Sequence, residues 1–104
     1  MQVQINFGDV DNSPALQERV KAAIDRALEH FTDRITRVEI HLHDDNASKA
    51  GSHDKRVVME ARPAGFAPLA VNHHGDDLYQ VIDEAAGKLS RAVKHKLDRA
   101  DARP

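Results

Sequence analysis

Residues 34–45 read RITRVEIHLHDD and carry the clearest strand pattern in the chain. Val38, Ile40 and Leu42 alternate with polar residues, as in a strand that buries one face. The polar positions include His41 and His43, and two aspartates follow them. Imidazoles and carboxylates at this spacing can form a metal site, or they can be the wet face of a strand that enters a turn. The remaining sequence must distinguish a metalloprotein from a binding module.

The residues before this strand predict one more strand and a helix. Residues 1–7 alternate between apolar and polar side chains, which is typical of a half-buried strand. Ser13 and Pro14 resemble a helix start, with serine as the N-cap and proline at the first helical position. The helix is expected to end at Thr32 and Asp33. Its apolar residues fall at helical spacing and are Leu16, Val20, Ala23, Ile24, Ala27, Leu28 and Phe31.

The residues after it predict two further strands and a second helix. Residues 44–54 are mostly small or polar and are expected to form a loop. Strands are predicted at residues 55–62 and 67–73, joined by a turn at residues 63–65. Asp76 or Asp77 is expected to cap the last helix. The apolar stripe of this helix is Leu78, Val81, Ile82, Ala85, Leu89, Ala92, Val93 and Leu97.

The element order is therefore βαβββα, which predicts an α+β fold. The last three strands can form an antiparallel meander, and the first strand can lie parallel to the second. Each strand has a single apolar face, so both helices should pack on the same face of a four-stranded sheet. A single domain is expected over residues 1–100, followed by a short C-terminal tail at residues 101–104.

Composition excludes several classes of protein. The 104 residues include no Cys, which rules out disulfides, thiolate catalysis and Cys-ligated zinc, and suits a reducing cytoplasm. We find no signal peptide and no apolar run long enough for a membrane span. The net charge is −2, but residues 88–104 hold six basic and two acidic residues. A protein of this kind can still present one basic face to a polyanion.

A basic stripe is predicted on the last helix. Lys88, Arg91, His95 and Arg99 are three or four residues apart, so they share one side, and Lys94 widens the stripe. Such a stripe is either a solvated helix face or a ridge that contacts RNA phosphates. Other cations that could extend the surface are Arg19, Lys21, Arg26 and Arg34, together with Lys55, Arg56 and Arg62 from the third strand.

Base stacking, metal binding and catalysis are not expected. Phe7 and Phe31 fit the core and Phe66 falls in a turn, so RNA would be recognised by shape and phosphate. A metal site needs three or four converging ligands, and the adjacent His73 and His74 would point to opposite faces of a strand. No nucleophile elbow or phosphate-binding glycine loop occurs. We therefore expect no enzyme activity, no cofactor, no metal and no small-molecule substrate.

Several short motifs resemble, in order and spacing, those of the ribosome hibernation-promoting factors and ribosome-associated translation inhibitors. The resemblance starts at the first strand, MQVQI, and continues through SPAL at residues 13–16 and HFTDRITRV at residues 30–38. It includes HDK at residues 53–55 and the turn PAG at residues 63–65. It ends with DLY at residues 77–79, Ile82 and Asp83, and KLSR at residues 88–91.

The resemblance implies a fold like that of double-stranded-RNA-binding domains and a cytoplasmic protein that binds the small ribosomal subunit. Members of this family occupy the channel for mRNA and tRNA and block translation in starved or stationary cells. The chain resembles the short type, which lacks a dimerisation domain. The alternative is a regulatory module of the same fold that binds another protein through its polar sheet face, which the thinned basic run and the pI of about 6.4 favour.

Overall fold

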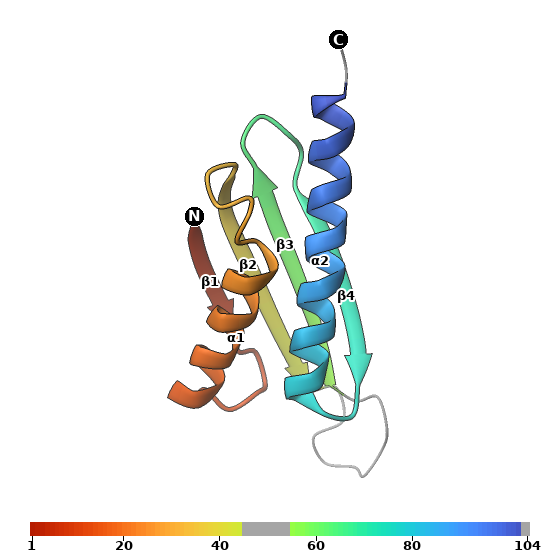
Figure 1. Ribbon diagram of the computed structural model, residues 1–104. Helices are drawn as coiled ribbons and strands as arrows, with labels where there is room; N and C mark the ends of the chain where they lie inside the picture. Colours follow the sequence, from red (N-terminus) through yellow and green to blue (C-terminus); the bar gives the residue numbers. More distant parts are fainter. Residues whose placement is uncertain (45–54, 103–104) are drawn as a thin grey trace.

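The computed structural model describes residues 1–44 and 55–102. These residues form β1 (Gln2–Asn6), α1 (Pro14–Ala27), β2 (Ile35–Asp44), β3 (Lys55–Pro63), β4 (Leu69–Gly75) and α2 (Leu78–Asp101) (Figure 1). The predicted βαβββα order is therefore confirmed. The predicted loop at residues 45–54 lies outside the described residues, as do residues 103–104 of the predicted tail.

The described strands form one sheet in the order β1-β2-β3-β4. β1 lies parallel to β2, with Val3 opposite Val38, and the next two pairs are antiparallel. Both helices cover the same face of this sheet, and the other face is left open (Figure 1). The predicted topology and the predicted packing of the helices on one face are both confirmed.

The core lies between the sheet and the two helices. Because strand side chains alternate, every second residue from Val38 to Leu42 in β2 and from Val57 to Ala61 in β3 faces the helices and is apolar. The described buried set contains no polar or charged side chain. It consists of Leu16, Val20, Ile24, Leu28, Ile35, Val38, Ile40, Leu42, Val57, Met59, Ala61, Val81, Ile82, Ala85, Ala86, Leu89, Val93 and Leu97.

The predicted end of the first helix was wrong. α1 ends at Ala27, and Leu28 is its C-cap, well before the expected Thr32 and Asp33. Turns follow, in which the Phe31 N–H donates to the Leu28 carbonyl oxygen at 2.8 Å. Leu28 is buried and Phe31 packs against the core. The apolar spacing continued past the helix because residues in successive turns also return to the same side every three residues.

The ends of several strands also differ from the prediction, whereas the predicted cap of the second helix is confirmed. β2 extends through Asp44, which pairs in register with Lys55. β4 runs from Leu69 to Gly75 rather than over residues 67–73, because the proline at position 68 has no N–H to donate to the ladder. α2 begins after Asp77, whose side chain accepts hydrogen bonds from the N–H groups of residues 79 and 80. The helix continues to Asp101.

Candidate nucleic-acid interface

Four of the predicted RNA-binding cations are paired with carboxylates. Arg19 on α1 contacts Asp83 of α2, with 2.5 Å between Nη2 and Oδ2. The other pairs are Arg34 with Asp101 at 2.8 Å, Lys94 with Asp98 at 2.6 Å and Lys55 with Asp44 at 3.2 Å. A carboxylate beside a cation offsets much of the attraction that a phosphate would feel. These four positions are therefore weaker candidates than the sequence indicated.

Hydrogen bonding changes the titration of two of these arginines. The Asp83 carboxylate accepts hydrogen bonds from Arg19 and raises the pKa of that guanidinium. Asp101 raises the pKa of Arg34 by the same kind of bond, and Arg34 in turn lowers the pKa of the Asp101 carboxyl group. Each pair links α2 to another part of the chain. The geometry indicates that Arg19 and Arg34 help to position helices.

A second set, of four cations and one histidine, lies along one side of α2, and we call it the basic α2 face. Three or four residues separate most neighbours in the set, so their side chains leave the helix on one side. In the part of the chain that the structure describes, none of them forms an ion pair with a carboxylate. The basic α2 face consists of Lys88, Arg91, His95, Lys96 and Arg99.

Two features position the basic α2 face. The apolar stripe of α2 packs against the core, so the basic side of the helix is directed away from the core. The Lys88 ammonium group then reaches the edge of the sheet and donates to the Asn72 carbonyl oxygen at 3.0 Å.

Arg26 of α1 and Arg91 of α2 line a hollow of 340 Å³ between the two helices. Arg26 can therefore extend the basic surface across this hollow.

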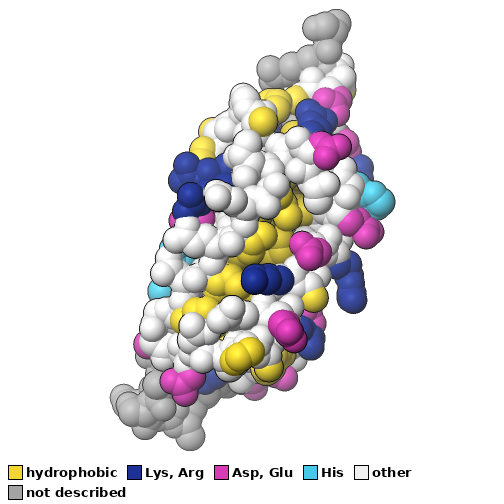
Figure 2. Space-filling model, turned by 90° about the vertical axis from the view of Figure 1, so that its left-hand side faces the viewer, with side chains coloured by type: hydrophobic (Ala, Val, Ile, Leu, Met, Phe, Trp, Pro, Cys, Tyr) yellow, Lys and Arg dark blue, Asp and Glu magenta, His cyan; other side chains and the backbone are white. Residues whose placement is uncertain are grey.

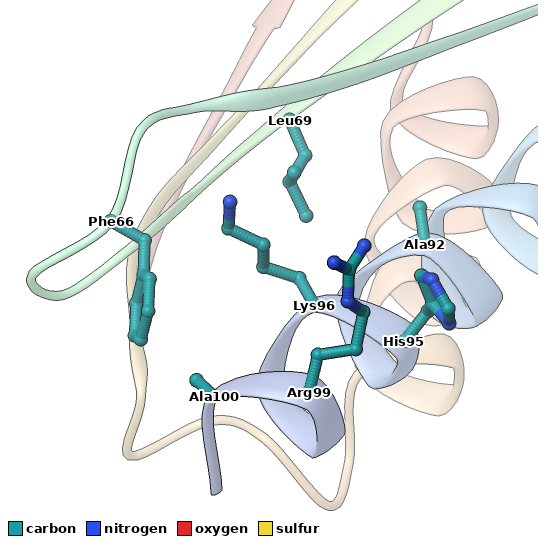
Figure 3. A pocket seen from close by; sticks show the side chains of 7 residues that line it. All are labelled: Phe66, Leu69, Ala92, His95, Lys96, Arg99 and Ala100. Carbon is teal, nitrogen blue, oxygen red and sulfur yellow. The ribbon is translucent and has the colours of Figure 1, made fainter. Parts of the chain in front are cut away.

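A larger hollow of 640 Å³ lies between the C-terminal half of α2 and the turn that joins β3 to β4 (Figure 3). We call it the Phe66 hollow. Apolar side chains come from the turn, β4 and α2, and three members of the basic α2 face contribute to its rim. The Lys96 ammonium group lies 5.8 Å from the centroid of the Phe66 ring. The lining residues are Phe66, Leu69, Ala92, His95, Lys96, Arg99 and Ala100.

Sequence reasoning did not include Lys96 and Phe66 among the site residues. Phe66 was predicted to lie in a turn, as it does, but its partner on α2 is distant in the sequence. A partial signal existed for Lys96. This residue directly precedes the buried Leu97 and follows Val93 by three positions, so it borders the apolar stripe and its side chain must run along the sheet side of the helix.

The structure does not bring the predicted cations of β3 to the basic α2 face. Lys55 lies at the end of β3 that is near the start of α2, where it pairs with Asp44. Arg56 is on the open face of the sheet, away from the helices, since it alternates with the buried Val57. Any contact that Arg56 makes with RNA would therefore belong to a different surface.

The histidines of the opening motif occupy the open face of the sheet. His41 and His43 alternate there with the buried Ile40 and Leu42. Arg56 stands between His43 and His74 in the strand register. His73 faces the helices instead, with Nε2 at 2.6 Å from a Glu84 carboxylate oxygen. Across residues 1–44 and 55–102, no three His, Cys, Asp or Glu side chains are grouped so that they could hold a metal ion.

The side of the molecule formed by β1 and α1 has mixed charge. Figure 2 shows basic and acidic side chains interspersed around an apolar band on this side. Partly buried residues of β1 and α1, among them Val3, Ile5 and Ala27, pack against the core here. In the described part of the chain, no helix is both long and apolar enough to cross a membrane. Among the described residues, the basic α2 face is the largest group of basic side chains without a carboxylate partner, and Lys21 and Arg26 of α1 also lack one.

The open face of the sheet is also mixed in charge. Arg62 lies 3.2 Å from Glu60 and 3.5 Å from Glu39, and Arg37 lies 3.7 Å from Glu39. Arg37 also donates to the Gln4 side chain across the β1–β2 pair. Acids and bases on this face largely neutralise one another. It lacks the single sign of charge that a phosphate backbone favours.

Solved structures share this fold. A ribosomal subunit interface protein from Coxiella burnetii superposes with a TM-score of 0.77 and 26% sequence identity, over 93% of this chain and 99% of that one. The N-terminal domain of Protein Y from Thermus thermophilus superposes with a TM-score of 0.74, over 91% of this chain and 98% of that one. The second protein is 19% identical, so it supports the fold alone.

Sequence comparisons identify the family. A ribosome hibernation promoting factor from Azotobacter vinelandii is 33% identical over 97 residues, which span 92% of this chain and 83% of that protein. A ribosome hibernation promotion factor from Bacillus subtilis (strain 168) is 29% identical over 100 residues, which span 49% of its length. The family model described as Sigma 54 modulation protein / S30EA ribosomal protein matches residues 3–101. The chain therefore belongs to the Sigma 54 modulation protein / S30EA ribosomal protein family, as its motifs predicted.

Proposed function

We propose that this protein is a ribosome-associated hibernation factor that binds the small ribosomal subunit through the basic α2 face. The names of its relatives point to ribosome hibernation and to a ribosomal subunit interface. One observation of the structure carries the proposal: four cations and His95 lie on one side of α2, and within the described residues none is paired with a carboxylate. Such a surface matches a phosphate backbone.

The mechanism is binding without catalysis. Lys and Arg side chains that approach RNA phosphates release condensed counterions, which favours association and makes it depend on salt. These contacts position the protein on RNA and carry little sequence information. We propose that the bound protein fills the channel for mRNA and tRNA on the small subunit and thereby prevents translation in stressed cells. Because the contacts are electrostatic and exposed, binding would be reversible.

The test is co-sedimentation of the protein with purified small subunits on sucrose gradients. The variant with Lys88→Ala and Arg91→Ala removes two unpaired cations from the basic α2 face, and we expect it to bind at least about tenfold more weakly. The control variant combines Arg34→Ala with Lys94→Ala, which removes the same charge from positions paired with Asp101 and Asp98. We expect the control to bind almost as well as the wild type.

Equal weakening in both variants would mean that overall charge governs binding and that the basic α2 face has no special role. Unchanged binding in the first variant would contradict the proposed surface. Thermal unfolding of both variants shows whether a loss of binding reflects a loss of folded protein. A polysome profile of starved cells, probed for this protein, would test whether it associates with ribosomes under stress.

The second candidate is a module that binds a protein partner through the open face of the sheet. The alternating acids and bases on that face favour it, because a surface with both signs of charge can match a complementary protein surface. Substitution of Glu39 and Arg62 by alanine would then abolish capture of the partner. Retention of small subunits by that same variant would favour the ribosomal role.

A further inference from the structure

The Phe66 hollow combines two features that a nucleotide requires. Phe66 and Leu69 provide an apolar surface, and the small side chains of Ala92 and Ala100 leave space on the helix side. The volume of 640 Å³ lies within the range of roughly 300–1,000 Å³ for small-ligand sites. Figure 3 shows Lys96 extending from α2 into the space between the helix and the turn. The hollow is therefore open, partly apolar and bordered by positive charge.

The basic residues at the rim have no acidic partner within the described residues. His95, Lys96 and Arg99 form no ion pair there, although Asp98 is adjacent to Arg99 in sequence and pairs instead with Lys94. The Lys96 ammonium group sits beside the Phe66 ring, at a distance typical of a cation–π contact. A ligand with one flat apolar part and one anionic part would use both the ring and the cations.

We propose that the Phe66 hollow accepts one unpaired nucleotide of a single-stranded RNA segment. The base would lie against Phe66 and Leu69, and the adjoining phosphate would contact Lys96 and Arg99. The hollow shares His95, Lys96 and Arg99 with the basic α2 face, so a strand whose phosphates follow α2 passes directly beside it. This inference rests on the proposed RNA-binding function and adds a specific contact to it.

Only an unpaired base can enter the hollow. A base within a duplex is stacked on its neighbours and cannot lie on a protein ring, whereas bases in loops and single strands can be splayed out and stacked on aromatic side chains. The contact tolerates different bases because each has an aromatic face. The protein would thus prefer single-stranded over double-stranded RNA. This differs from the sequence-based expectation that no aromatic residue stacks on RNA.

The experiment measures binding of short RNA probes to the full chain by calorimetry. The probes are an oligoadenylate, an abasic oligomer with the same number of phosphates, a matching duplex, and adenosine monophosphate. We expect the oligoadenylate to bind about tenfold more tightly than the abasic oligomer, because stacking of a base adds to the phosphate contacts. Phe66→Ala should remove this preference, and Phe66→Tyr should retain it because the ring is kept.

Two further variants separate the hollow from general effects. Ala100→Phe fills the hollow without removing a charge and should also abolish the preference for the oligoadenylate. Tyr79→Ala is the aromatic control: Tyr79 is 41% exposed on α2 but lies outside the hollow, so the preference should persist. If Phe66→Ala unfolds the protein, Ala100→Phe still tests whether the hollow accepts a base.

Equal affinity of the wild type for the oligoadenylate and the abasic oligomer would overturn the inference. So would a preference that survives Phe66→Ala and Ala100→Phe, or one that disappears in Tyr79→Ala. Binding of adenosine monophosphate as tight as that of the oligomer would identify a site for a free nucleotide instead. Co-sedimentation with small subunits is measured in parallel. If co-sedimentation persists while the preference for the oligoadenylate is absent, the nucleotide site in the Phe66 hollow is refuted and the proposed function is not.

Discussion

Gly8 and Gly65 show how the same backbone conformation can have different consequences at two residues. Both have left-handed φ angles, 56° at Gly8 and 83° at Gly65. A Cβ atom on Gly8 would lie 2.8 Å from the Leu42 carbonyl oxygen, while one on Gly65 would meet nothing within 4 Å. Position 8 therefore requires glycine for its positive φ and for lack of space, whereas position 65 requires it only for its positive φ.

We expect Gly8→Ala to lower the free energy of unfolding more than Gly65→Ala does. The second substitution should cost about 1–2 kcal/mol, the usual penalty of an L residue in this conformation. The first adds a clash with the backbone of β2, which cannot move aside without disturbing the sheet. Urea denaturation of both variants measures the difference. Equal losses would contradict the close approach of Gly8 to β2.

Residues of the same type also differ in what they can offer a ligand. Arg19 and Arg99 are both exposed arginines on helices, but Arg19 donates two hydrogen bonds to Asp83 and lies 5.4 Å from the centre of the Tyr79 ring. Arg99 has no carboxylate partner within the described residues and lines the Phe66 hollow. The partner of each arginine, more than its place in the sequence, determines its role.

At the scale of elements, the Arg34–Asp101 pair joins the end of α2 to the segment between α1 and β2. Arg34 Nη1 and Nη2 lie 2.8 and 3.1 Å from the two carboxylate oxygens, so the contact is bidentate. The pair lowers the pKa of Asp101, mainly by the hydrogen bond from Arg34. Folding therefore disfavours protonation of Asp101, and the stability contributed by this group falls as the pH falls through its lowered pKa.

We expect Asp101→Asn to lower Tm slightly near about pH 7, with the difference from the wild type shrinking toward about pH 3. The variant cannot lose a carboxylate contact on acidification, and the wild type can. Arg34 does not contribute to this dependence on pH, because its pKa is raised from an already high value and the side chain stays charged at acidic and neutral pH. Thermal unfolding monitored by circular dichroism gives the Tm of both proteins at each pH.

A double variant with Arg34→Gln and Asp101→Asn serves as the control. Its Tm should depend on pH in the same way as that of Asp101→Asn, because neither variant has an ionisable group at position 101. A difference in Tm between the wild type and Asp101→Asn that stays constant across this pH range would show that the pair does not couple folding to protonation.

Elements themselves were largely predictable. Apolar periodicity identified the strands and helices, and Ser13 and Asp77 were correctly expected to act as caps. The predicted end of α1 was wrong because the turns after Leu28 repeat their apolar residues at nearly the spacing of a helix. The predicted start of β4 was wrong because the proline at position 68 has no N–H to donate, so the ladder begins at Leu69, opposite Ala61.

At the scale of the whole molecule, net charge conceals a strong asymmetry. The chain carries −2 overall, but its acids pair with bases on α1 and on the open face of the sheet, which leaves the basic α2 face unneutralised within the described residues. A polyanion responds to this local surface more than to the total charge. A slightly acidic protein can therefore bind RNA.

Binding to small subunits should weaken steeply as salt is raised. On a plot of log association constant against log salt concentration, each lost phosphate contact should reduce the slope by about 1. The variant with Lys88→Ala and Arg91→Ala should therefore show a slope smaller by about 2, and the paired-cation control should keep the wild-type slope. Filter binding over a salt series measures both. A slope that is the same in all three proteins would contradict phosphate contacts at α2.

The candidate site was only partly predictable. Helical spacing correctly grouped Lys88, Arg91, His95 and Arg99 on one side of α2, because that spacing is a local property. Lys94 was expected to widen this stripe, and Arg19 and Arg34 to extend the surface, but all three are paired with carboxylates. Asp83 and Asp101 lie far from Arg19 and Arg34 in the sequence, so a stripe of charge does not reveal these two pairs. The partner of Lys94 is four residues away on the same helix, a spacing that the sequence does show.

The sequence alone determined the order of the elements, the apolar face of each, the absence of cysteine chemistry and the resemblance to the family that the comparisons then established. These depend on periodicity and composition, which act over a few neighbouring residues. The tertiary structure decided which cations are neutralised and where the chain is hollow. Ion pairs such as Arg34 with Asp101, and the approach of Lys96 to Phe66, join residues far apart in the chain, so they exist only once the helices have packed on the sheet.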